Sequence, residues 1–378
     1  MPSLSLDLFC KVVDNFGDIG ICWRLARQLR HEHGIAVTLW VDDLRTFQRI
    51  CPQVDSAAGR QMIESVAVRH WAGQDGEFTP ADVADIVIEF FGCDIPPRYI
   101  AAMAQRTARP VWLNLEGLTA EEWVEGCHGL PSMHPRLKLT KHFFFPGFTE
   151  KTGGLLCESG LEAERAAFVA DPAAAAGFLA TLGVTPAEAA AAKVSLFCYP
   201  YAPVAELFAA WRDGTQPVAC LVPEGVASDA VAAFLGAPAM PGAVRSEGAL
   251  TVRVLPFVPQ QDYDRLLWSC DLNFVRGEDS WVRAQWAGKP FVWHIYAQDE
   301  NLHHKKLRAF LQRYAGGAEL DEFSLCWNGA AQGDWAGLWL ALEAAMPAIS
   351  AKSAEWQQKI LGNGDLATNL TKFCASLK

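Results

Sequence analysis

The chain has 378 residues, which at roughly 150 residues per domain predicts two globular domains. Hydrophobic residues make up 51% of it and charged residues 20%, which excludes a disordered chain or a collagen-like repeat. The chain has 32 Lys and Arg residues against 43 Asp and Glu residues, and this net charge of −11 excludes a general nucleic-acid binder.

The first part of the chain alternates strand and helix patterns. A helix is predicted from about Asp18 to His33, where Gly34 is placed to end it, and Pro96-Pro97 opens a second helix. The predicted strands are residues 4–13, 36–41, 86–91 and 110–115. This order predicts a mostly parallel sheet covered on both faces, in a domain over residues 1–160.

Alanine dominates residues 161–192, which we interpret as a helical connector with helix starts at Asp171 and Thr185. The strand and helix alternation resumes over residues 193–362 and predicts a second doubly wound domain. Its predicted strands are residues 194–198, 218–222, 250–254, 272–275 and 290–294, with a helix at residues 204–211. The chain then looks helical from Ser353 to its end, and we expect residues 363–378 to pack back on the first domain.

The sequence shows no pattern of a membrane-spanning or secreted protein. No stretch approaches the roughly 18 apolar residues of a transmembrane helix, and residues 1–13 lack the pattern of a signal peptide. The 11 cysteines are scattered, without a Cys-x-x-Cys pair, and read as reduced thiols in the core. These features predict a cytoplasmic protein that makes no membrane contact.

Two carboxylates follow the first predicted strand, in the loop from Asp14 to Gly20. Doubly wound sheets place their ligands at this end of a strand, but the glycines lack the G-x-G-x-x-G spacing of a dinucleotide site. Asp14 and Asp18 would repel a pyrophosphate and favour a cationic or hydrogen-donating ligand. Alternatively, Asp14 makes an Asx turn and Asp18 caps the helix.

A second cluster, residues 276–281, follows another apolar strand and opens a helix. The helix start at Asp279 and Ser280 is suited to phosphate oxygens, and Arg276 could add positive charge there. Glu278 is placed to hold a sugar hydroxyl. A plain helix cap explains Asp279 and Ser280 equally well.

Aromatic residues near the predicted strand ends have two interpretations. Phe197 and Tyr199 are more often core residues than a ligand platform. Phe257 and Gln260 lie at a strand end, where a ring can stack on a base and an amide can read its edge.

Residues 14–29 (DNFGDIGICWRLARQL) and 276–296 (RGEDSWVRAQWAGKPFVWHIY) resemble those of the EarP family, protein-arginine rhamnosyltransferases acting on translation elongation factor P. The resemblance spans essentially the whole chain. It implies an α/β fold of GT-B type, in which two Rossmann-like domains face each other across a cleft. The acceptor protein would bind the first domain, and dTDP-β-L-rhamnose the second.

The resemblance further implies inversion at the anomeric carbon, with no cofactor and no metal required. It carries acidic catalytic positions onto Asp14, Asp18 and Glu278, and an acceptor-side loop onto Asn15, Phe16 and Gly17. The donor-site positions, to which Arg276 is added on its charge, are Phe197, Tyr199, Phe257, Gln260, Arg276, Asp279, Ser280 and Tyr296.

Arginine chemistry explains why acids are needed. A guanidinium pKa of about 12.5–13.8 lies about 10 units above an ordinary Asp, or roughly 13–14 kcal/mol, so prior deprotonation is expensive. We therefore expect Asp18 to orient the guanidinium and to take its proton after the carbon–nitrogen bond has begun to form. Asp14 would hold either a guanidinium N–H or a rhamnose hydroxyl.

Three other functions fit parts of the pattern. A GT-B glycosyltransferase with another nucleotide sugar or a small-molecule acceptor fits the two halves equally well. A nicotinamide-dependent oxidoreductase is disfavoured by the missing glycine fingerprint. A non-catalytic partner of the translation machinery would bind no nucleotide.

Overall fold

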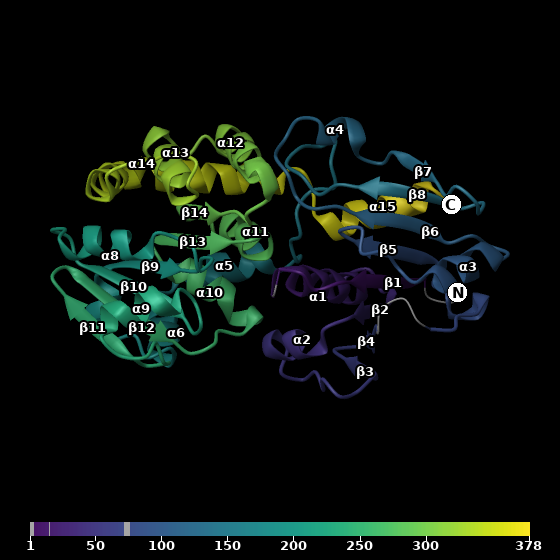
Figure 1. The fold of residues 1–378 in the computed structure, drawn as a ribbon, viewed down its shortest axis with the longest axis horizontal. Helices are drawn as coiled ribbons and strands as arrows, with labels where there is room; N and C mark the ends of the chain where they lie inside the picture. Colours follow the sequence, from purple (N-terminus) through teal and green to yellow (C-terminus); the bar gives the residue numbers. More distant parts are fainter. Residues whose placement is uncertain (1–3, 15, 72–75) are drawn as a thin grey trace. The chain divides into compact units, whose positions relative to one another are not determined.

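The computed structural model describes residues 4–14, 16–71 and 76–378, and it divides into two compact units. Unit 1 is Met1–Ser159 together with Ile360–Lys378, and unit 2 is Gly160–Lys359. Each unit is built around one largely parallel sheet with helices packed on it (Figure 1). The predicted α/β fold class is therefore confirmed.

Unit 1 holds an eight-stranded sheet in the order β3-β4-β2-β1-β5-β6-β8-β7. Only the edge pairs β3–β4 and β7–β8 are antiparallel. The strands are β1 (Ser5–Cys10), β2 (Ala36–Val41), β3 (Arg60–Ile63), β4 (Val66–His70), β5 (Ile86–Phe90), β6 (Val111–Leu115), β7 (Pro131–Met133) and β8 (Thr140–Phe144). The helices are α1 (Phe16–His31), α2 (Leu44–Ile50), η1 (Pro80–Asp82), α3 (Pro97–Gln105), α4 (Val124–Cys127) and α15 (Leu366–Ser376).

Unit 2 holds a six-stranded sheet in the order β11-β12-β10-β9-β13-β14, in which only β11–β12 is antiparallel. The strands are β9 (Ala192–Leu196), β10 (Val218–Pro223), β11 (Val244–Glu247), β12 (Leu250–Leu255), β13 (Leu272–Arg276) and β14 (Phe291–His294). The helices are α5 (Leu161–Ala170), α6 (Pro172–Thr181), α7 (Pro186–Ala190), α8 (Val204–Arg212), α9 (Ser228–Leu235), α10 (Gln260–Ser269), α11 (Asp279–Ala287), η2 (Asp299–Asn301), α12 (Leu302–Tyr314), α13 (Ala318–Trp327) and α14 (Trp335–Leu361).

The first strand is shorter than predicted, and the first helix begins earlier. β1 ends at Cys10 because the next backbone N–H groups bond to side chains instead of a neighbouring strand. Val12 N–H donates to Asp42 at 2.8 Å, and Val13 N–H donates to Asp18 at 2.7 Å. α1 begins at Phe16, so Asp18 lies inside its first turn rather than at its start.

The alanine-rich segment forms α5, α6 and α7. Its two predicted helix starts are confirmed, with Asp171 accepting the Ala173 N–H and Thr185 forming a capping box with Glu188. α5 and α6 both pack against α10 of unit 2. This segment is thus built into the second sheet's helical layer.

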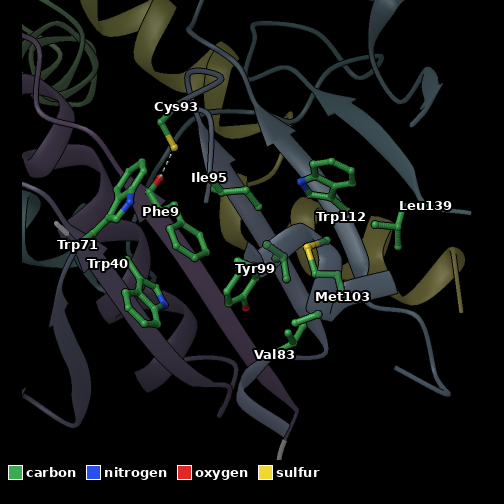
Figure 2. Close-up of a cluster of buried hydrophobic side chains, with 12 residues drawn as sticks. Phe9, Trp40, Trp71, Val83, Cys93, Ile95, Tyr99, Met103, Trp112 and Leu139 are labelled. Atoms are coloured by element: carbon green, nitrogen blue, oxygen red, sulfur yellow. Dashed lines mark hydrogen bonds between the residues drawn. The ribbon is translucent and has the colours of Figure 1, made fainter. Parts of the chain in front are cut away.

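The core of unit 1 contains a cluster of aromatic side chains (Figure 2). The Phe9 ring stacks on Trp40 with centroids 5.4 Å apart and meets the edge of Tyr99 at 5.0 Å. The Cys93 thiol donates to the Phe9 carbonyl at 3.4 Å, drawn as the dashed line. These contacts hold β1 in the core of unit 1, and the chain continues from β1 to Asp14 and to Asp18 in α1.

The end of the chain forms two helices rather than one, because Gly364 takes a positive φ of +74° after α14. α15 belongs to unit 1, where Leu366 N–H donates to the Leu155 carbonyl at 2.9 Å. Gln28 of α1 donates to Asp365 at 3.1 Å. Unit 1 is therefore completed by residues that come more than 200 positions after its last strand.

Candidate active site

Asp18 is the most buried of the predicted acidic residues in unit 1, with 4% of its surface exposed. Its Oδ2 accepts the backbone N–H groups of Val13 at 2.7 Å and Asp14 at 2.8 Å. Oδ1 receives no hydrogen bond from the residues that the structure describes. One oxygen is thus held by two backbone N–H groups of the loop, and the other is not.

Burial raises the pKa of Asp18 above its ordinary value, and the nearby charge of Asp42 adds to this. The two backbone N–H groups oppose the rise but do not cancel it. A carboxylate with a raised pKa binds a proton more readily, which suits a group that must accept one. The helix-cap alternative is wrong, because Asp18 bonds to residues before α1 and not to the first N–H groups of the helix.

The predicted acceptor-side loop directly precedes Asp18 in the chain. Gly17 N–H donates to the Asp14 carbonyl at 2.8 Å, which closes a turn. A Cβ placed on Gly17 would lie 3.1 Å from Asp14 Oδ2, so the absence of a side chain lets the Asp14 carboxylate approach α1. Phe16 is the half-buried first residue of α1, and Asn15 lies outside the described residues.

In unit 2, Arg276 at the end of β13 lies over two aromatic rings. Its guanidinium carbon is 4.4 Å from the centroid of Phe197 and 5.0 Å from that of Tyr199. Nη1 donates to the Cys198 carbonyl at 3.1 Å, and the other guanidinium N–H groups meet no acceptor among the described residues. The structure thus brings Phe197, Tyr199 and Arg276 together and holds a positive charge at the strand ends.

The start of α11 differs from a plain capped helix. Glu278 occupies the N-cap position and makes no side-chain cap bond. Ser280 Oγ accepts the Arg276 N–H at 3.0 Å and donates to the Arg276 carbonyl at 2.5 Å. Asp279 accepts from Gln260 Nε2 of α10 at 3.3 Å. The plain-cap alternative for Asp279 and Ser280 is therefore wrong.

The remaining predicted donor residues lie at the same edge of the sheet. The Tyr296 ring, 48% exposed after β14, is 5.7 Å from the Tyr199 ring. Phe257 is half-buried in the loop between β12 and α10. Arg276 is thus the last residue of β13, and the other seven predicted donor residues and Glu278 follow the carboxyl ends of strands β9, β12, β13 and β14 within unit 2.

Two residues of this region were not predicted from the sequence. His294 Nδ1 accepts the Tyr199 N–H at 3.1 Å, and the Tyr263 ring lies 5.9 Å from that of Phe197. Tyr263 could have been found by helical spacing, since it lies one turn after Gln260 on α10. His294 ends an apolar strand, and no local pattern marks it.

Neither metal ligands nor a membrane helix are found in the described ranges. No group of three or more His, Cys, Asp or Glu side chains there is placed to hold a metal ion. Across residues 4–14, 16–71 and 76–378, no helix has both the length and the apolar character that a membrane span needs.

Two largely parallel sheets, each with polar residues at its strand ends, form an α/β fold of the GT-B type. Two solved structures share this fold at 11% identity. One is MurG of Acinetobacter baumannii, with a TM-score of 0.54 and coverage of 99% of this chain and 100% of that chain. The other is a ugt transferase of Siraitia grosvenorii, with a TM-score of 0.53 and coverage of 99% of both chains.

Comparison with more similar proteins identifies the family. The family model of the Elongation-Factor P (EF-P) rhamnosyltransferase EarP matches residues 6–375. Protein-arginine rhamnosyltransferases of Pseudomonas putida KT2440 and Pseudomonas aeruginosa PAO1 are each 48% identical to this chain. The first comparison covers 97% of both chains, and the second covers 98% of this chain and 99% of the relative.

A solved structure that describes EarP-mediated arginine glycosylation of translation elongation factor EF-P agrees with this. It is 35% identical, with a TM-score of 0.68, and the match covers 98% of this chain and 99% of that one. The chain therefore belongs to the EarP family of protein-arginine rhamnosyltransferases, and the resemblance seen in the sequence is confirmed.

Proposed function

We propose that this enzyme transfers L-rhamnose from dTDP-β-L-rhamnose to an arginine side chain of translation elongation factor P, with inversion at the anomeric carbon. The family supports an arginine acceptor and a rhamnose donor. The observation that carries the donor assignment is the Arg276 guanidinium, which lies over the rings of Phe197 and Tyr199 at the end of β13, three residues before α11 begins. A fixed cation beside a helix N-terminus suits a diphosphate.

Unit 2 would bind the nucleotide sugar. Phe257 and Gln260 would contact the base, and Glu278 a sugar hydroxyl. Tyr296 would lie beside the sugar, since its ring is half-exposed against Tyr199. When the anomeric carbon loses dTDP, negative charge grows on the β-phosphate, and Arg276 with the N-terminal end of α11 would stabilise it.

Unit 1 would bind the acceptor protein through the loop of Asn15, Phe16 and Gly17. The Asp18 carboxylate, anchored through Oδ2, would orient the guanidinium through Oδ1. A new bond forms between a guanidinium nitrogen and the anomeric carbon as the bond from that carbon to the dTDP oxygen breaks. Asp18 then takes the proton from the attached nitrogen, which has become acidic.

Asp14 would hold either a second guanidinium N–H or a rhamnose hydroxyl. No cofactor and no metal is needed in this scheme, because Arg276 and α11 supply the positive potential that a metal provides in other transferases. Transfer in the presence of a chelator at the rate seen without it would support this, and loss of transfer restored by a divalent ion would contradict it.

Intact-mass analysis of elongation factor P, after incubation with enzyme and dTDP-β-L-rhamnose, tests the reaction. One added deoxyhexose, mapped to an arginine by fragmentation, is the expected result, and an α-linked product in the NMR spectrum would show inversion. An unmodified acceptor, or modification only with another nucleotide sugar such as a UDP-sugar, would contradict the proposal.

A further inference from the structure

His294 joins two loops that carry the proposed donor residues. It is the last residue of β14 and only 1% of its surface is exposed. Nδ1 accepts the backbone N–H of Tyr199, in the loop after β9, at 3.1 Å. Its carbonyl accepts the N–H of Gly277, in the loop after β13, at 3.3 Å. A single residue thus binds both loops through their backbones.

The protonation state of the ring follows from the first of these bonds. A backbone N–H can donate to Nδ1 only if Nδ1 carries no proton, so the neutral ring holds its proton on Nε2. Burial lowers the pKa of His294 to about 3, and the charge of Arg276 acts in the same direction. His294 is therefore a permanent acceptor for Tyr199 at physiological pH.

The ring is also fixed by its neighbours. It meets the rings of Tyr199 at 5.2 Å, Tyr201 at 4.9 Å and Trp327 at 5.8 Å, each at a steep angle. Tyr199 in turn supports the Arg276 guanidinium at 5.0 Å. A displacement of the Tyr199 backbone would therefore move one of the two rings on which the cation rests.

We propose that His294 is a positioning residue for donor binding: through Nδ1 it holds the Tyr199 loop, and thereby Arg276, in the geometry that receives the diphosphate of the nucleotide sugar. This inference rests on the proposed function of unit 2 as the donor-binding unit. His294 itself does not touch the reacting atoms in this scheme.

Two substitutions distinguish the effect of losing the hydrogen-bond acceptor Nδ1 from the effect of losing the aromatic ring. His294→Phe keeps a flat ring of similar size but leaves the buried Tyr199 N–H without an acceptor. His294→Asn places an amide oxygen near the position of Nδ1. Losing a buried acceptor should weaken dTDP binding and raise the KM for dTDP-rhamnose by roughly tenfold to a hundredfold in His294→Phe, with a much smaller change in kcat. His294→Asn should recover most of that loss.

His128 offers a matched control. It is a half-buried histidine of unit 1 whose Nδ1 also accepts a backbone N–H, that of Phe145, at 3.1 Å. Because His128 is not part of unit 2, where the donor is proposed to bind, His128→Phe should bind dTDP as the wild type does. Circular dichroism and the thermal midpoint of each variant would show that it is folded before affinity is compared.

A cavity of about 460 Å³ beside the ring provides a second readout. It is lined by His294 together with Tyr201, Trp327 and Trp335. Imidazole added to His294→Ala could enter through this cavity and accept the Tyr199 N–H again. Recovery of dTDP affinity with imidazole, and none with the wild type, would support the inference.

Calorimetric titration with dTDP distinguishes failure of the proposed function from failure of the proposed role of His294. If the wild type binds no dTDP, the proposed function fails. If the wild type binds dTDP and His294→Phe binds it equally well, the proposed function stands and the role of His294 is overturned. Equal weakening in His294→Phe and His294→Asn would also overturn it, because the acceptor would then not be what matters.

Discussion

At the scale of single residues, the surroundings of Asp18 determine both the pKa and the position of its carboxylate. Burial raises its pKa, and two backbone N–H groups hold Oδ2 in place. We predict that Asp18→Asn lowers the rate of rhamnosyl transfer by roughly a hundredfold or more, since a positioned base contributes about that much. Affinity for dTDP-rhamnose should remain that of the wild type. Intact-mass rates and calorimetry measure the two quantities.

Asp42→Asn is the control for this prediction. Asp42 also accepts a backbone N–H of the same loop, that of Val12, at 2.8 Å, but is not placed as a base. The variant should retain most of the transfer rate. Comparable turnover by Asp18→Asn and the wild type would refute the assignment of Asp18.

The raised pKa of Asp18 also predicts a pH dependence. Only the ionised form can take a proton, so transfer should fall as pH is lowered through a pKa above the ordinary 3.8. The effect on stability runs in the opposite direction. The folded state binds the Asp18 proton more tightly than the unfolded state does, so this contribution to the free energy of unfolding is complete below the unfolded-state pKa. It is lost as pH rises through the folded-state pKa. Asp18→Asn should therefore have an equal or higher thermal midpoint at pH 7, and a lower one would count against this reasoning.

Glu278 yields a residue-scale prediction for the donor side. It occupies the N-cap of α11, two residues after Arg276, and so lies among the residues proposed to bind the donor. Glu278→Ala should weaken donor binding by about tenfold or more, because a hydrogen bond to a charged group is worth roughly 1.5–3 kcal/mol. Calorimetry with dTDP-rhamnose measures this. Glu319→Ala, which removes an exposed acid from the first turn of α13, should leave donor affinity unchanged.

At the scale of elements, helices α10 and α11 lie side by side and present Gln260 and Asp279 from their first residues (Figure 1). A buried ion pair fixes one helix to the other. Arg283 Nε and Nη2 donate to the two oxygens of Asp264, each at 2.7 Å, and the Arg283 side chain is 1% exposed. The relative position of the two helix starts therefore depends on an ion pair about one turn into each helix.

We predict that Asp264→Ala lowers the free energy of unfolding by about 3–5 kcal/mol, since it leaves the Arg283 charge buried without its partner. Urea unfolding measures this loss. Asp262→Ala on the same helix is the control, because its pair with Arg265 is 39–43% exposed and should contribute no more than about 1 kcal/mol. Similar losses in both variants would contradict the distinction between buried and exposed pairs.

At the scale of the whole molecule, unit 1 is made from the two ends of the chain. α15 returns to it after all of unit 2, and Leu370 is fully buried there. The Phe373 ring lies 5.4 Å from Phe144 of β8, which adds an aromatic contact between the helix and the last parallel strand. Unit 1 therefore cannot complete its core until α15 has been made.

Leu370→Ala should lower the free energy of unfolding by about 2–5 kcal/mol, the usual cost of emptying a buried leucine site. Hydrogen exchange should place the lost protection in residues of unit 1 and not in residues 160–359. Leu377→Ala, at a position 38% exposed, should change stability little. Equal loss of protection in both units would mean that they unfold together, contrary to this prediction.

The amino-acid sequence by itself determined the alternation of strands and helices, the capping box at Thr185 and the EarP-type motifs, because these depend on local periodicity and on residues close together in the chain. It placed Asp18, Arg276 and Ser280 after strands, where ligands are expected. It did not show that β1 ends at Cys10, where the next N–H groups bond to side chains, or that α1 begins at Phe16.

Only the tertiary structure decided the surroundings of those residues. The raised pKa of Asp18 comes from burial, which no local pattern measures. The bond from Tyr199 to His294 spans 95 positions in the sequence, and Arg276 reaches the ring of Phe197 from another strand. Such contacts arise when parallel strands distant in sequence end at one edge of a sheet, so they exist only once the whole sheet has formed.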